Sequence, residues 1–196
     1  MQPLFNYLKQ FHTLSNEFTR HYEQHCSLVH IKKHKFVLSP LDTNNSIFFL
    51  LQGVVRGFIK EDKKDISIWF GFENQFIEAV RNPDLQSNYS TEYIQAIEDC
   101  VLIRIPYNLT NFLYANYPEA NVLARKLLAV LYFQATERST LARIPTALGR
   151  YLKLEESNMD TRRVPQRYLA SYLGMRLETL SRIRNKPSEI KILKTA

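Results

Sequence analysis

The stretch QRYLASYLGMRLETLSRIRN, residues 166–185, decides how the C-terminal third of this chain folds. Apolar side chains recur in it at helical spacing: Leu169, Leu173, Leu180 and Ile183. Gly174 stands between the two apolar edges, where a tight turn favours a residue without a Cβ. Pro165 precedes the first edge, at a position where a helix tolerates the missing N–H. The pattern predicts a helix-turn-helix.

The second of these helices has polar and basic side chains at its outward positions: Arg176, Glu178, Thr179, Ser181, Arg182 and Arg184. Side chains of these types bind base edges and phosphates in DNA complexes. The segment therefore favours a DNA-binding regulator. The alternative is a helical hairpin that packs in a core and has a charged outer face.

The placement of charge supports DNA binding. The chain has 26 Lys and Arg against 19 Asp and Glu, a net charge of +7. Residues 1–135 hold 13 basic and 13 acidic side chains, whereas residues 136–196 hold 13 basic and 6 acidic ones. The whole excess lies beside the helix-turn-helix, and Lys and Arg supply most of the sequence-independent affinity for DNA. An acidic protein or a membrane surface is the other kind of partner that a basic region allows.

Composition and cysteine usage narrow the function classes. A length of 196 residues with 45% hydrophobic side chains allows one large or two small domains with a real core. Cys26 and Cys100 form no Cys-x-x-Cys unit, so we expect no zinc or iron–sulfur site and no structural disulfide. No apolar run is long enough to span a bilayer and no signal-peptide pattern is present. We therefore expect a soluble, cytoplasmic protein without a membrane partner.

Residues 29–105 have β character. Short β-rich runs alternate there with turn-like stretches: residues 36–38, 46–51, 54–60, 66–70, 93–97 and 100–105. Several short strands with frequent turns predict an antiparallel sandwich or jelly roll. Before them, residues 1–25 carry Leu and Phe at three- and four-residue spacing, which predicts one amphipathic helix.

A long helix is predicted over residues 109–138. Apolar residues step along it by three and four, near heptad spacing: Leu113, Tyr117, Ala120, Ala124, Leu127 and Leu131. We expect this edge to form a dimer seam, and a second edge of Leu123, Leu128 and Tyr132 to pack on its own domain. The alternative is a helix that packs only on its own β-domain. Pro118 falls in the first turns and either starts or kinks the helix.

The expected organisation has three parts. An α+β domain over residues 1–107 combines the N-terminal helix with an antiparallel β-roll. The dimerisation helix covers residues 108–139, and the basic helix-turn-helix domain covers residues 140–196. In this last part, Leu141 to Leu152 predict a first helix and residues 158–163 a polar connector.

This order of elements resembles the Crp/Fnr family of bacterial transcription regulators over nearly the whole chain. The most specific local match is Leu173-Gly174 followed by ETLSRI at residues 178–183, which is similar to the family's recognition-helix pattern. Residues 51–56, LQGVVR, resemble the strand–glycine–strand segment early in the family's β-roll. The resemblance implies a jelly roll of the cyclic-nucleotide-binding kind that binds an effector, a long helix that dimerises, and a winged-helix-like domain whose recognition helix enters the major groove.

The resemblance also implies roles in DNA binding. Glu178 and Arg182 are the expected base readers, and Arg176 and Thr179 are expected to contact bases or phosphate. Phosphate contacts are expected from Arg162, Arg163 and Arg167, and Arg184 completes the expected DNA-binding set. The expected partners are double-stranded DNA, a second copy of the chain and RNA polymerase.

The effector site departs from the family's pattern. Cyclic-nucleotide-binding members carry Phe-Gly-Glu and later Arg followed by Ser or Thr, so that Glu binds the ribose and Arg neutralises the phosphate. Here Glu78 keeps the carboxylate, but Ile77 replaces the glycine and Ser90 stands before Thr91 in place of Arg, while Glu92 adds negative charge. Glu78, Ser90 and Thr91 remain the candidate effector-binding residues. We expect no control by cyclic AMP, no cofactor, and either another small-molecule effector or none.

The histidines suggest an alternative class of function, a cupin-type metal enzyme. His21 and His25 lie one helical turn apart and could share a metal. No carboxylate completes a ligand set, so we expect surface histidines and no metal. Cupins take their ligands from within the strands, and residues 36–105 contain no histidine. Since no catalytic constellation is legible either, we do not expect an enzyme.

The C-terminus is short for this family. Pro187 stops the recognition helix, and residues 188–196 suffice for one strand, so we expect a shortened wing. A short wing keeps an alternative function open, an effector-binding or protein-interaction dimer whose DNA-binding domain has decayed.

Overall fold

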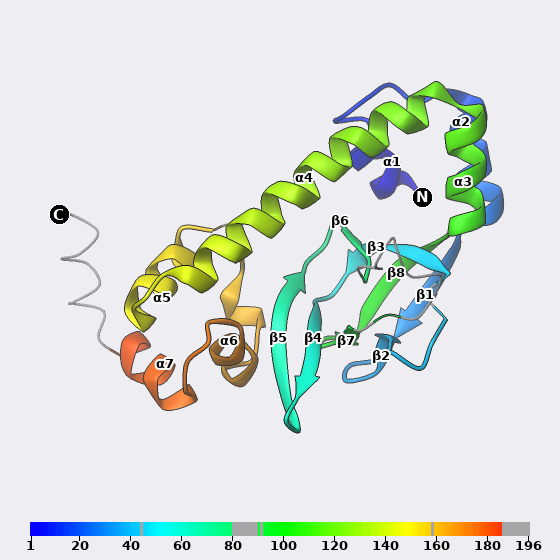
Figure 1. Cartoon of the computed structure of the whole chain (residues 1–196). Coiled ribbons are helices and arrows are strands. Elements are labelled where there is room, and N and C mark those ends of the chain that lie inside the picture. Colours follow the sequence, from blue (N-terminus) through cyan, green and yellow to red (C-terminus); the bar gives the residue numbers. More distant parts are fainter. Residues whose placement is uncertain (44, 80–89, 91, 158, 186–196) are drawn as a thin grey trace.

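The computed structural model describes residues 1–43, 45–79, 90, 92–157 and 159–185. Two short helices, α1 (Gln2–Leu8) and α2 (Asn16–His25), precede a β-roll, and a long helix leads from the roll to the C-terminal helices (Figure 1). The predicted α+β class is confirmed. Among the described residues, no helix combines the length and the apolar composition that crossing a membrane requires.

The roll consists of two four-stranded antiparallel sheets. The first sheet has the strand order β1-β8-β3-β6 and the second the order β2-β7-β4-β5. The strands are β1 (Ser27–Ile31), β2 (Phe36–Leu38), β3 (Ser46–Gln52), β4 (Val55–Glu61), β5 (Lys64–Gly71), β6 (Gln75–Ile77), β7 (Tyr93–Ala96) and β8 (Cys100–Pro106). The antiparallel roll expected from the sequence is therefore confirmed.

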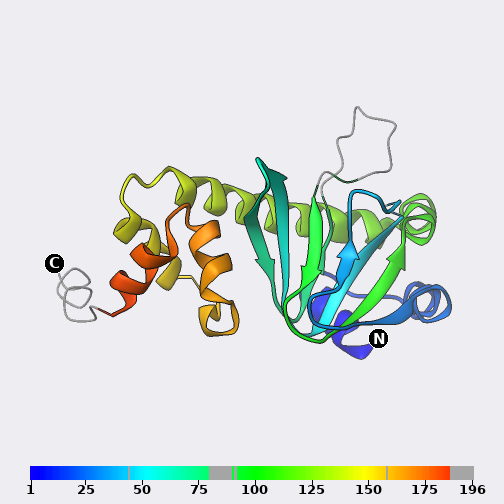
Figure 2. The same ribbon diagram turned by 90° about the horizontal axis from the view of Figure 1, so that it is seen from below.

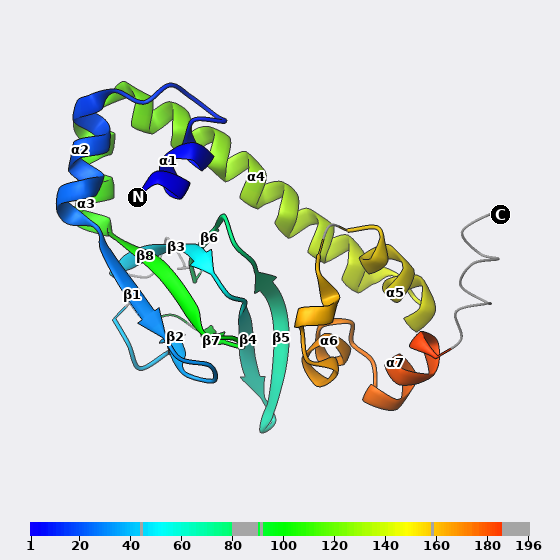
Figure 3. The ribbon, with the colours of Figure 1, turned by 180° about the vertical axis from the view of Figure 1, so that it is seen from behind.

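The first sheet has a separate core on each of its two faces. Leu50 of β3 pairs with Leu102 of β8, and both are buried between the two sheets. The neighbouring pair, Phe49 and Ile103, points to the opposite face, because side chains alternate along a strand. Phe49 and Ile103 pack there against the N-terminal helices, and Figure 3 shows α1 lying between the sheet and the long helix.

Two of the strands, β1 and β6, are missing from the sequence prediction. Most of β1 is exposed or half-buried, so its residues carry little apolar alternation. β6 has only three residues, and it forms by pairing with β3 between Phe48 and Leu50. Both strands depend on tertiary pairing, which local pattern does not record.

Two helices predicted as continuous are each divided. The N-terminal region breaks before Ser15, whose hydroxyl caps α2 by accepting from the Phe18 N–H at 3.2 Å. The long helix divides into α3 (Tyr107–Asn116) and α4 (Pro118–Arg143). Pro118 starts α4, because a proline disfavours the helical conformation of the residue before it, and Tyr117 is extended at φ −128°.

The C-terminal part contains α5 (Ala147–Glu155), the 3-10 turn η1 (Thr161–Arg163), α6 (Gln166–Tyr172) and α7 (Leu177–Arg184). The pair α6 and α7 confirms the predicted helix-turn-helix. Gly174 has φ +59° in the turn, and the Leu180 side chain is fully buried beneath α7. Leu141 lies in the last turn of α4 rather than in a first helix of this domain.

Candidate nucleic-acid interface

The outer face of α7 is the strongest candidate for contact with DNA. Arg176, Glu178 and Arg182 are exposed, and Thr179 is half-buried beside them. The side chains of the three exposed residues have no hydrogen-bond or ion-pair partner among the described residues. Leu180 anchors the opposite face of the helix in the core. The residues of α7 that are predicted to contact bases or phosphate therefore lie together on one accessible face of the helix.

Arg150 of α5, which the sequence analysis did not single out, braces the helix-turn-helix. Its Nε and Nη2 donate to the carbonyl oxygens of Leu173 and Gly174 at 2.6 and 3.2 Å. Its Nη1 donates to the Ile144 carbonyl oxygen at 2.8 Å, just beyond α4. A cation that satisfies the free carbonyls at helix ends stabilises them. Arg150 therefore ties the turn of the motif to the end of the long helix.

Arg184, a member of the expected DNA-binding set, contacts η1 and α5 of its own protomer. Its Nη2 donates to Thr161 Oγ1 at 3.1 Å, and its guanidinium lies 5.9 Å from the centre of the Tyr151 ring. Arg184 therefore packs on its own domain. The helix is eight residues long and ends at Arg184, so this side chain comes from the last turn, where it reaches back over η1.

Arg162 and Arg167 remain accessible for phosphate contact. Arg162 is 88% exposed and pairs with Asp160 at 2.9 Å. Arg167 is exposed at the start of α6, where its guanidinium lies 4.6 Å from the centre of the Tyr168 ring and its Nη2 donates to the Tyr168 hydroxyl at 2.7 Å. Both side chains keep their charge near the helix-turn-helix.

Arg163, the third expected phosphate contact, instead joins the helix-turn-helix domain to the roll. Its Nη1 and Nη2 donate to the two carboxylate oxygens of Glu73 at 2.8 and 2.7 Å. Its Nε and Nη2 donate to Glu98 at 3.1 and 2.6 Å. The hydrogen bonds from Arg163 to Glu73 are the largest of the causes that lower the pKa of Glu73 to about 2. We call Glu73, Glu98 and Arg163 the clasp.

A second set of contacts joins α6 to strand β5, and the two elements lie side by side in Figures 1 and 2. Ser171 Oγ donates to the Asp65 carbonyl oxygen at 3.1 Å and accepts from the Ser67 N–H at 3.0 Å. Arg56, which is 2% exposed, stacks 3.7 Å from the centre of the Tyr168 ring and pairs with Asp65 at 2.8 Å. These contacts hold α6, the first helix of the helix-turn-helix, against β5 of the roll.

The three expected effector residues are not brought together. Glu78 accepts a hydrogen bond from the Tyr107 hydroxyl at 2.5 Å and faces the helices, whereas its neighbours Ile77 and Ala79 fill the interior of the roll. Ser90 is buried, and its hydroxyl donates to the Glu92 carbonyl oxygen and accepts from the Glu92 N–H. Thr91 lies outside the described residues.

The expected dimer seam needs correction. Leu113 and Ala120 are 1% and 4% exposed, and they pack with α1, α2 and the roll in their own protomer. Tyr117 and Leu127 pack on the same cluster, and Ala124 is half-buried. The exposed apolar side chains of α4 come later in the helix. Leu128, Leu131 and Tyr132 lie on one side and define an apolar stripe, whereas Phe133 is exposed on another side. Of the expected seam, only Leu131 belongs to this stripe.

The two histidines weighed as metal ligands make other contacts. His21 Nε2 lies 2.8 Å from the Tyr117 hydroxyl, and His25 Nδ1 lies 3.0 Å from the His21 carbonyl oxygen. Among the described residues, no group of three or more His, Cys, Asp or Glu side chains is arranged to hold a metal ion.

A β-roll, a long helix and a helix-turn-helix in this order define the fold of the Crp/Fnr transcription regulators, and solved structures of that kind match this chain. FixK2 from Bradyrhizobium japonicum has a TM-score of 0.69 and 18% identity, over 82% of this chain and 83% of that one. CLP from Xanthomonas campestris, described as a c-di-GMP-responsive global regulator, has a TM-score of 0.67 and 15% identity, over 89% and 92%. A protein from Eubacterium rectale assigned to the crp/fnr family has a TM-score of 0.66 and 16% identity, over 94% and 88%. No family model and no curated protein matches the sequence.

Proposed function

We propose that this protein is a transcription regulator that binds double-stranded DNA through α7. The observation that carries the proposal is the free face of α7, where Arg176, Glu178 and Arg182 are exposed and unpaired among the described residues. Arginine binds guanine O6 and N7 in the major groove, and a glutamate accepts from cytosine N4. Arg182 and Glu178 are therefore the proposed base readers.

Non-specific affinity comes from cations around the motif. Arg162 and Arg167 are accessible beside α6, and the last third of the chain holds the whole net charge of +7. Each phosphate that such side chains neutralise releases a counterion, so binding falls steeply with salt. Arg163 and Arg184 are left out of the proposed contacts, because intramolecular contacts hold both guanidinium groups.

The active species is proposed to be a homodimer formed through the apolar stripe of α4. Leu128, Leu131 and Tyr132 are 66%, 39% and 74% exposed and lie within about one third of the helix circumference, so they form a continuous apolar surface. Two stripes that pack about a two-fold axis form a self-complementary interface. The two recognition helices then read half-sites about one helical turn apart, roughly 34 Å, in a nearly palindromic operator.

Control by cyclic AMP is not part of the proposal. The hydroxyl of Ser90, which stands where the resemblance implies an arginine, is engaged with the backbone of Glu92. The Glu92 carboxylate accepts from Trp69 Nε1 at 3.1 Å, and burial raises its pKa. No described group in this part of the roll is therefore arranged to neutralise a cyclic phosphate.

The test is selection from a random double-stranded DNA pool by the purified protein at moderate salt, followed by sequencing. An enriched palindrome supports a dimeric regulator, and the Arg182→Ala variant should lose preference at one position in each half-site. Arg20→Ala, which removes an exposed arginine from α2, is the matched control and should keep the wild-type preference. If the wild-type protein enriches no sequence, even with cell extract added as a source of effector, the proposal is wrong and the decayed-domain alternative stands.

A further inference from the structure

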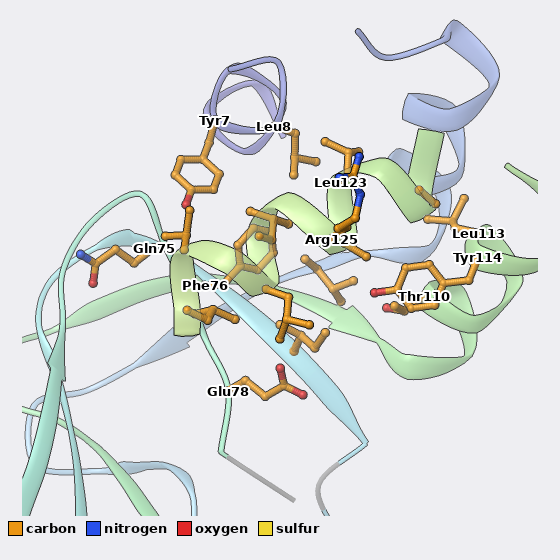
Figure 4. A pocket seen from close by; sticks show the side chains of 18 of the residues that line it. Tyr7, Leu8, Gln75, Phe76, Glu78, Thr110, Leu113, Tyr114, Leu123 and Arg125 are labelled. Carbon is orange, nitrogen blue, oxygen red and sulfur yellow. The ribbon is translucent and has the colours of Figure 1, made fainter. Parts of the chain in front are cut away.

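A pocket of about 330 Å³ lies outside the roll, between the first sheet and helices α1, α3 and α4. Its walls are largely apolar and come from several elements, including Leu8 of α1, Phe76 of β6, Leu113 of α3 and Leu123 of α4 (Figure 4). It is separate from the interior of the roll, because side chains such as Ile77 and Leu50 pack between the two sheets.

Polar groups converge on the side of this pocket away from α1. Figure 4 shows Glu78, Thr110 and Tyr114 there, with their oxygen atoms turned toward the cavity. One oxygen of Glu78 accepts from the Tyr107 hydroxyl at 2.5 Å, which fixes the carboxylate in place. The Tyr114 hydroxyl has no hydrogen-bond partner among the described residues. Burial and the charge of Glu78 raise the pKa of Tyr114, so its hydroxyl stays protonated and can donate.

The geometry points to a site for a small, mostly apolar molecule that carries one hydroxyl or amino group. Such a group donates to the Glu78 carboxylate and, when it is a hydroxyl, also accepts from Tyr114. A pocket with apolar walls and a few convergent polar groups is the usual form of a small-molecule site. The volume lies at the lower end of the range of about 300–1,000 Å³ for small-molecule pockets, which favours a ligand the size of a single ring or a short chain.

Anionic ligands are excluded at this polar end by the charge of Glu78. A carboxylate or phosphate placed there meets a like charge in a partly desolvated site. Arg125 also lines the pocket, but it is exposed, and Figure 4 shows its side chain extending away from Glu78. The site therefore differs in both place and charge from a cyclic-nucleotide site.

The pocket is lined by α4 from Ala120 to Gln134, and two residues of the apolar stripe, Leu128 and Leu131, are among its lining residues. Binding therefore acts on the helix that joins the roll to the helix-turn-helix domain. An effect of this ligand on the affinity for DNA rests on the proposed function, whereas binding of the ligand to the pocket does not.

Binding is tested with three probes that share one apolar body: 4-phenylbutylamine, 4-phenylbutan-1-ol and 4-phenylbutyrate. Calorimetric titration of the full-length protein should give dissociation constants on the order of millimolar for the amine and the alcohol, as ligands of this size allow. The carboxylate should bind at least tenfold more weakly. The Glu78→Gln variant should lose this preference and bind the carboxylate as well as it binds the amine.

Two substitutions of alanine by leucine on α4 distinguish binding in the pocket from binding elsewhere on the helix surface. Ala124→Leu places three extra carbons against the cavity and should abolish binding of the amine and the alcohol. Ala129→Leu, at an exposed position of the same helix, should bind them as the wild type does. If the wild type binds neither probe, or if Ala124→Leu and Ala129→Leu bind equally, the proposal is overturned. Selection of DNA without any probe is independent of this outcome, so the two proposals can fail separately.

Discussion

Replacing Arg163 by alanine should weaken the attachment of the helix-turn-helix domain to the roll. Arg163 makes four charge-assisted hydrogen bonds to Glu73 and Glu98, and the three side chains are only about one-third exposed. The Glu73 pKa falls from 4.5 to about 2, chiefly through the hydrogen bonds from Arg163 and in smaller part through backbone N–H groups such as that of Gly53, so at about 1.4 kcal/mol per pKa unit Arg163 accounts for less than about 3.5 kcal/mol. Solvent screening lowers this to about 2 kcal/mol. The variant also leaves two carboxylates facing each other without a cation.

Thermal unfolding followed by circular dichroism measures this loss. For a chain of this length, 2 kcal/mol corresponds to a fall in Tm of about 4–8 °C. The control is Arg162→Ala, which removes the neighbouring arginine but breaks only an exposed pair with Asp160, and it should change stability by less than about 0.5 kcal/mol. If the two variants have the same Tm, the clasp does not stabilise the interface and the reasoning fails.

Three further outcomes are expected. The folded state lowers the Glu73 pKa from 4.5 to about 2, so the contribution of this carboxylate to the free energy of unfolding is complete above pH 4.5 and is lost as the pH falls toward 2. Unfolding midpoints measured against pH should show this loss in the wild type and not in Glu73→Gln. Leu128→Glu should shift the protein from dimer to monomer in sedimentation velocity, whereas Gln24→Glu, an exposed position on α2, should leave the dimer intact. Arg184→Ala should lower Tm by a few degrees through loss of its contacts with Thr161 and Tyr151, and in DNA selection it should keep the wild-type sequence preference.

The sequence predicted correctly those helices and strands in which apolar residues recur at the spacing of a helix or a strand. The helix-turn-helix could be predicted because Leu169 and Leu180 are buried on facing helices and Gly174 occupies a conformation with φ +59°. The same holds for long strands such as β3 and β8. Strands that depend on a partner were missed, as β6 shows, because pairing with β3 is not encoded in its three residues.

The sequence predicted a basic candidate interface at the helix-turn-helix, but it did not predict which arginines are accessible there. Arg162 and Arg163 are adjacent and chemically identical, yet one is 88% exposed and the other binds two carboxylates of the roll. Those carboxylates, Glu73 and Glu98, lie 90 and 65 positions away in the chain. No local signal marks such a partnership, since it arises only when the two domains meet. A cluster of arginines beside a helix-turn-helix therefore predicts a basic surface but not which guanidinium groups are free.

The apolar residues of α4 also show what the sequence could not predict. One part of this helix packs within its own protomer, and another part is exposed and is proposed to pack on a second copy. Ala120 and Leu123 are 4% and 3% exposed, since α1 and the roll cover the first half of the helix. Leu128 and Tyr132, just beyond Leu127, are 66% and 74% exposed, whereas Leu141 near the end of the helix is buried again, in a cluster with Val54 and Phe70 of the roll. Heptad spacing is the same in both halves, so it predicts an apolar contact without telling an intramolecular partner from a second protomer. What separates the two is whether other elements of the protomer cover that turn of α4, and the proposed dimer must therefore form through the exposed turns between Leu127 and Leu141.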